Sequence, residues 1–77
     1  MNVVFIKMPL YNDDESVYIN PEYIQMINVC YNRSGSSKVV EYYKVIMANG
    51  SAHKISSTTA RALIEFIGEN FTVEDLG

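Results

Sequence analysis

Aromatic and basic side chains gather around one short loop of the sequence, and together they can bind a nucleotide. The loop is RSGSSK (residues 33–38), with Tyr31 before it and Tyr42 after it. Tyrosine rings stack on bases, while cations and backbone amides near a glycine hold phosphate groups. The sequence therefore predicts a ligand site for a nucleotide or cyclic nucleotide, formed by Tyr31, Arg33, Ser34, Lys38 and Tyr42. The structural alternative is that the tyrosines pair across neighbouring strands and the loop is only a turn.

Other reactive side chains lack the partners that catalysis or metal binding requires. His53 can act as an acid or base only beside a carboxylate, and Cys30 as a nucleophile only beside a base. Neither pair is visible in the sequence, so His53 is expected to face solvent. Asp13, Asp14 and Glu15 are consecutive and lack the spacing of a calcium-binding loop. We therefore expect no catalytic residue, no metal and no cofactor, and the protein is predicted not to be an enzyme.

The composition indicates one small, mildly acidic domain. The chain has 77 residues, 48% of them apolar, and nine acidic against six basic side chains give a net charge of -3. General binding to nucleic acid is not expected, because it requires clustered Lys and Arg. The first residues do not resemble a secretory leader, the apolar runs are too short to cross a bilayer, and the single cysteine suits a reducing compartment. A cytoplasmic protein without membrane contact is expected.

The order of the secondary-structure elements follows from local patterns. Val, Ile and Tyr dominate the apolar residues and favour strands, which are expected over residues 3–8, 16–20, 24–31, 38–48 and 51–55. The pair Asn49-Gly50 predicts a two-residue hairpin turn. Helical spacing over residues 60–67 predicts an amphipathic helix from about residue 58 to residue 67, capped by the Ser/Thr run at residues 56–59 and closed by Gly68.

The predicted fold is α+β, with a curved antiparallel sheet of about five strands and one C-terminal amphipathic helix on one face, in the order β-β-β-β-β-α. It forms a single domain over residues 1–77, in which residues 72–77 are a loose tail. The two longest strands are apolar on both sides, and one helix covers only one side. A chain of this length also buries only about 60% of its surface and has no disulfide. We therefore expect a homo-oligomer joined through the uncovered face or a strand edge, with an interface that includes Met26, Val40, Tyr43 and Val45.

Several segments follow one another in a familiar order: VYINPEYI (residues 17–24), a strand through Ile27, VIMANG (residues 45–50) and the C-terminal helix. In these segments the chain resembles the FlbD-like family of small flagellar-operon proteins and similar short bacterial and phage proteins. The match covers about two-thirds of the chain, from residue 17 to residue 67. It departs from the family in a longer connection at residues 32–38 and in an extra first strand. The resemblance implies a small β-rich accessory protein and supplies no active site.

Two functions are predicted from these observations. The first is a non-enzymatic, oligomeric binding or inhibitory accessory protein of bacterial or phage origin, which acts through protein–protein contacts with itself and with a larger protein complex. The alternative is a protein that sequesters a nucleotide or cyclic nucleotide at a subunit interface.

Overall fold

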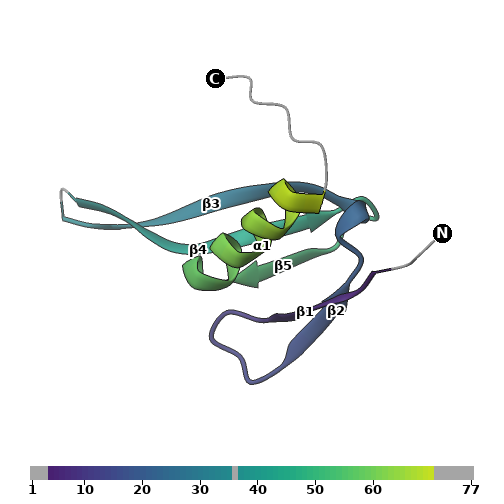
Figure 1. Cartoon of the computed structure of the whole chain (residues 1–77). Coiled ribbons are helices and arrows are strands. Elements are labelled where there is room, and N and C mark those ends of the chain that lie inside the picture. Colours follow the sequence, from purple (N-terminus) through teal and green to yellow (C-terminus); the bar gives the residue numbers. More distant parts are fainter. Residues whose placement is uncertain (1–3, 36, 71–77) are drawn as a thin grey trace.

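Five strands and one C-terminal helix form two antiparallel sheets (Figure 1). The computed structural model describes residues 4–35 and 37–70. The elements are β1 (Ile6–Pro9), β2 (Ser16–Ile19), the 3-10 turn η1 (Pro21–Tyr23), β3 (Ile24–Ser34), β4 (Ser37–Met47), β5 (Ala52–Ile55) and α1 (Ser57–Asn70). β1 pairs with β2, and the second sheet has the order β3-β4-β5. The α+β class is confirmed, but the expected single five-stranded sheet is wrong. The predicted tail at residues 72–77 lies outside the described residues.

The turn η1 explains why there are two sheets. Asn20 caps this turn, because its Oδ1 accepts the Glu22 N–H over 3.0 Å and its carbonyl accepts the Tyr23 N–H over 3.0 Å. Pro21 is buried and fixes the backbone at the first position of the turn. The chain is thereby redirected between β2 and β3. The loop between β1 and β2 contacts the second sheet, where the Tyr11 N–H donates to the Lys54 carbonyl over 2.8 Å.

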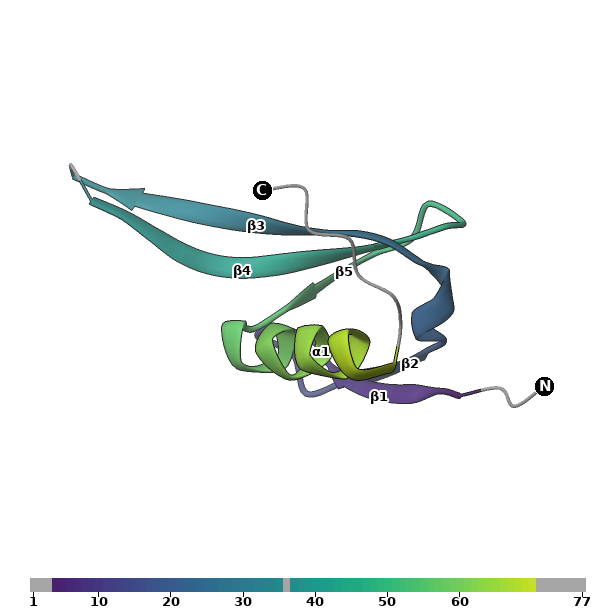
Figure 2. The ribbon, with the colours of Figure 1, turned by 45° about the horizontal axis from the view of Figure 1, so that its top comes forward.

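The core lies on one side of the three-stranded sheet. Figure 2 shows α1 and β1 on the same side of that sheet, and every layer contributes to the buried cluster. This cluster consists of Met8, Ile19, Val45, Met47, Ile55, Ala60 and Leu63. We call this side the covered face and the other side the open face. Among the described residues, no element lies over the open face (Figure 2).

Both hairpin turns of the second sheet differ from their predictions. β3 extends to Ser34 and β4 begins at Ser37, so the predicted loop at residues 32–37 is a tight connection in which Gly35 has φ +63°. At the other turn, Gly50 has φ +92° but Asn49 does not have a positive φ. The Met47 N–H donates to the Ser51 carbonyl over 2.8 Å, which leaves a three-residue loop closed by glycine in place of the expected two-residue turn.

Helix α1 is longer than predicted at its C-terminal end. Gly68 lies inside the helix without a positive φ, so its predicted role as the closing residue is wrong. The Asn70 side chain donates to the Phe66 carbonyl over 2.9 Å and satisfies one carbonyl of the last turn. The N-terminal cap is confirmed, because Ser56 Oγ accepts the Thr59 N–H over 3.2 Å.

Removal of this cap is expected to destabilise the fold measurably. Ser56→Ala deletes the oxygen that accepts the Thr59 N–H, and the lost cap should lower the free energy of unfolding by about 1 kcal/mol. Urea denaturation followed by circular dichroism measures this change. Ser57→Ala is the control, because Ser57 is exposed and its side chain makes no hydrogen bond to the described residues. Equal losses in the two variants would contradict the assignment of Ser56 as the cap.

Two glycines are expected to respond to alanine with opposite signs. Gly50→Ala places a side chain on a backbone with φ +92° and should cost about 1–2 kcal/mol. Gly68→Ala adds a methyl group to open space inside a helix and should stabilise by about 0.5–1 kcal/mol. Thermal unfolding at one protein concentration checks both. A stabilised Gly50→Ala variant would be inconsistent with the turn described above.

Candidate functional site

The predicted nucleotide cluster is divided between the two faces of the sheet. Lys38 Nζ lies 4.3 Å from the centre of the Tyr31 ring, and Arg33 is the register partner of Lys38, so these three residues share one face. Tyr42 is the register partner of Cys30, the residue before Tyr31. Successive residues of a strand point to opposite faces. The structure therefore does not bring Tyr42 to the other members of the cluster.

Tyr42 belongs to a different group of side chains. Its ring centre lies 5.5 Å from that of Tyr11 and 4.8 Å from Lys54 Nζ. A side-chain hydrogen bond with Cys30 raises the pKa of the Tyr42 hydroxyl above its ordinary value, because this bond favours the protonated phenol. Tyr42 is thus a neutral aromatic residue on the open face.

The hairpin of β3 and β4 projects from the body of the molecule as an arm (Figures 1 and 2). β5 pairs only with residues 43–46 of β4, so residues 30–42 form a two-stranded ribbon. The backbone of Ser34, paired with Ser37, lies at its tip. Tyr31 is 49% exposed and Val39 is 56% exposed. Two-stranded ribbons are marginally stable alone in water, so an arm with apolar side chains suits contact with a partner.

The four predicted interface residues have different environments. Met26 lies on β3 and is 46% exposed. Val40 is half-buried, and Tyr43 is half-buried and packs against the core. Val45 is fully buried on the covered face, so its assignment to an interface is wrong. The physical reason is strand alternation, which places Val45 with Met47 toward the helix.

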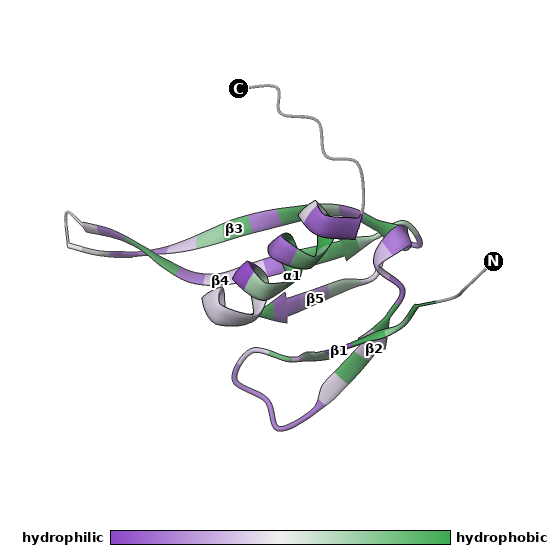
Figure 3. Cartoon of the chain, in the orientation of Figure 1, coloured by the Kyte–Doolittle hydropathy of each residue, from purple (hydrophilic) through white to green (hydrophobic). Residues whose placement is uncertain are grey.

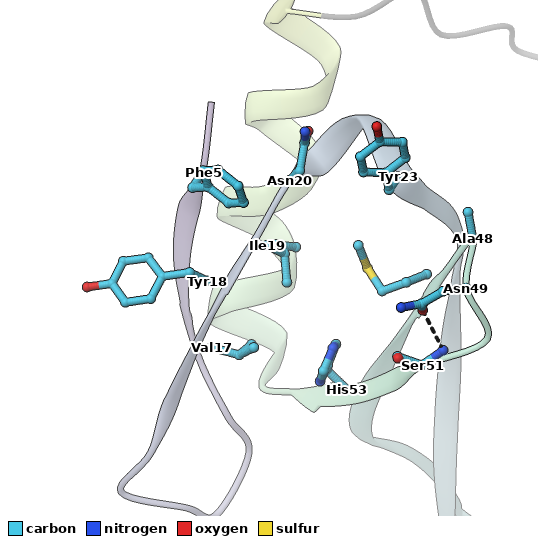
Figure 4. Close-up of a pocket in the computed structure, with 11 residues that line it drawn as sticks. Phe5, Val17, Tyr18, Ile19, Asn20, Tyr23, Ala48, Asn49, Ser51 and His53 are labelled. Carbon is cyan, nitrogen blue, oxygen red and sulfur yellow. Dashed lines mark hydrogen bonds between the residues drawn. The ribbon is translucent and has the colours of Figure 1, made fainter. Parts of the chain in front are cut away.

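A cavity of about 610 Å³ lies between β2 and the turn that joins β4 to β5, and the sequence did not predict it (Figure 4). Its wall includes Phe5, Ile19, Asn20, Tyr23, Asn49 and His53. Figure 4 shows His53 extending from β5 into this space, while the Tyr18 ring points away from it. The prediction that His53 faces solvent is wrong, because His53 is half-buried and is the register partner of the buried Val45. Asn20 and Asn49 were visible in the sequence only as turn residues.

Comparisons with known proteins identify no relative of this chain. No protein-family model, curated protein or solved structure matches the chain. The resemblance to the FlbD-like family therefore stays a prediction. None of the described helices is both long enough and apolar enough to span a membrane.

Proposed function

We propose that this chain is a non-catalytic, self-associating protein-binding module whose copies join along the free edge of β3. The main support is the chemistry of that edge. β3 is eleven residues long and is an outer strand of its sheet. No charged residue or proline occurs over residues 24–32. Outer strands that remain unpaired are usually protected by charges, prolines or bulges.

The other edges of this three-stranded sheet do have such protection. In the arm, the edge of β4 contains Lys38, and a register irregularity falls at Glu41. The edge of β5 is contacted by the β1–β2 loop, where Tyr11 donates to the Lys54 carbonyl. On β3 itself the extra residue is Gln25, near its start, while the shift after Cys30 places its extra residue, Glu41, on β4. The free edge of β3 is therefore the most suitable one for pairing with another strand.

The hydrogen-bond pattern identifies the backbone groups that would form this pairing. The Met47 N–H donates to the carbonyl of Ser51, the residue before β5, so the backbone groups of Met47 point toward β5. In an antiparallel sheet these groups point alternately to the two neighbouring strands. Lys44 and Tyr42 of β4 then bond to β3, so their partners Asn28 and Cys30 use their backbone groups internally. The backbone N–H and C=O groups of the intervening residue, Val29, point outward. They are available to a second copy.

Side chains on both sides of β3 favour the same conclusion. Met26 on the open face is 46% exposed, and Val29 and Tyr31 on the covered face are 40% and 49% exposed. Figure 3 shows the hydrophobic positions distributed along β3. A strand added at the edge would cover apolar side chains on both faces, which a contact through one face would not do.

Antiparallel pairing of two β3 strands would join two three-stranded sheets into one six-stranded sheet. The two open faces would then form one surface, on which a larger protein complex can bind. We propose that binding of a larger complex to this surface is the inhibitory or accessory role of the protein. The free thiol of Cys30 suits a reducing compartment such as a bacterial cytoplasm.

The oligomeric state tests this proposal directly. Sedimentation velocity and light scattering at micromolar concentration should give twice the mass of the 8.7 kDa chain. Amide hydrogen exchange of Val29 should slow as protein concentration rises, because its N–H becomes hydrogen-bonded in the dimer. A folded monomer at these concentrations would overturn the proposal.

A second candidate function is nucleotide binding on the arm. It is supported by the Tyr31 ring, which is 49% exposed and lies beside Lys38 and near Arg33 on one face. A base can stack on the free side of this ring while the cations hold phosphate. A thermal-shift panel of nucleotides and cyclic dinucleotides tests it, because a ligand at 100 times its Kd stabilises by about 2.7 kcal/mol. Absence of any shift would exclude this candidate at the concentrations used.

A further inference from the structure

We propose that the cavity between β2 and the β4–β5 turn binds a small aromatic carboxylate. The cavity is far along the sheet from the arm, and this proposal does not depend on self-association. Its volume of about 610 Å³ lies within the range of small-molecule sites, roughly 300–1,000 Å³. The chemistry of its wall indicates the class of ligand.

Two asparagine side chains in the cavity wall are held in fixed orientations. The Glu22 N–H donates to Asn20 Oδ1 over 3.0 Å, and the Ser51 N–H donates to Asn49 Oδ1 over 2.9 Å. Each backbone bond holds one amide oxygen and leaves the Nδ2 hydrogens without a partner among the described residues. Pre-oriented donors of this kind favour a ligand that offers acceptor oxygens.

His53 adds a third polar group, from the same β4–β5 hairpin that contains Asn49. Its imidazole extends into the cavity (Figure 4), and no described residue forms a hydrogen bond or ion pair with it. Among the described residues that line the cavity, none is Asp, Glu, Lys or Arg. An imidazole and two amides offer enough N–H donors for the two oxygens of one carboxylate, whereas a phosphate has more oxygens and more charge to satisfy and an amine would lack a counter-charge.

The rest of the wall suits an aromatic ring. Ile19 is buried at the floor, and Phe5 and Tyr23, each 62% exposed, stand at the mouth. Figure 4 shows the last two on the side of the cavity where Asn20 lies. A planar ring can pack against the apolar floor and contact these aromatic side chains. A nucleobase fits less well, because it also presents N–H donors and the amide oxygens of the two asparagines already accept backbone bonds.

Titrations followed by ¹H–¹⁵N NMR test this site. Indole-3-carboxylate and benzoate should bind with Kd below about 1 mM, a typical affinity scale for small fragments, and should shift the side-chain Nδ2 resonances of Asn20 and Asn49. N-acetylphenylalanine serves as a third probe, and its binding would indicate the C-terminal residue of a peptide as the source of the carboxylate. Benzylamine and uracil should not bind. Failure of all three carboxylates, or equal binding of benzylamine or uracil, would overturn the proposal.

Two variants connect binding to this cavity. Ala48→Trp places a large ring at the mouth and should abolish binding, while Asp14→Trp, at an exposed turn outside the cavity, should not change it. His53→Phe keeps a ring but removes the imidazole nitrogens, and should weaken carboxylate binding at least fivefold. The backbone NMR spectrum shows whether each variant is folded. Unchanged affinity in a folded Ala48→Trp variant would also overturn the proposal.

Discussion

Replacement of Ile55 by alanine is expected to lower the melting temperature by about 10 °C or more. Ile55 is fully buried at the point where β5, β4 and the helix meet. Truncation of a buried isoleucine leaves a cavity and costs about 2–5 kcal/mol. A domain of this length is stabilised by only about 4–11 kcal/mol in total. One kcal/mol corresponds to about 4–8 °C in so small a domain, so the change should be large.

Ile64→Ala is the matched control for this experiment. Ile64 lies on α1 and is 49% exposed, and alanine is the better helix former, so less than about 1 kcal/mol should be lost. Both variants are compared by thermal unfolding at the same protein concentration, because self-association would raise the stability of either one. Similar losses for the two isoleucines would contradict the core described above.

The sequence predicted the elements well because their patterns are local. The helical spacing of Ala60 and Leu63 and the cap at Ser56 depend only on near neighbours, and the structure confirms them. Ile64 belongs to the same predicted apolar face of the helix but is half exposed, because β4 and the β1–β2 hairpin do not cover the whole of that face. The division into two sheets was not predicted. It depends on the direction in which the Pro21 turn sends the chain, which no periodicity records.

The candidate sites were harder to predict, because they depend on register and on long-range packing. Tyr31 and Tyr42 are near each other along the hairpin, but their partners in the ladder place them on opposite faces. The cavity joins residues of β2 to a turn some thirty positions later, and each of these residues has an ordinary local role. The uncharged stretch of β3 was visible in the sequence, but only the strand order identifies it as a free edge.

Substitution of Val29 by lysine is expected to convert the self-associated protein into a folded monomer. Val29 lies in the middle of β3, its side chain is 40% exposed, and its backbone groups are inferred to point to the free edge. Lysine on an outer strand opposes pairing with another chain, and a symmetric dimer would contain two such charges close together. The long side chain can reach water in the monomer, so the fold should be retained. The Kd of self-association should rise at least about 100-fold, a change typical of charge placed at the centre of an interface.

Val39→Lys distinguishes pairing at the edge from packing through the open face. Val39 is 56% exposed on the open face of the arm, and it lies on β4, away from the free edge of β3. Edge pairing predicts that Val39→Lys remains associated while Val29→Lys does not. Packing between open faces predicts the reverse, because the new charge would then lie inside the contact and Val29 would lie outside it. Sedimentation velocity across a concentration series measures both variants, with circular dichroism to confirm that each is folded. Dissociation caused by Val39→Lys alone would contradict pairing through β3 and would instead indicate that the open face is the interface.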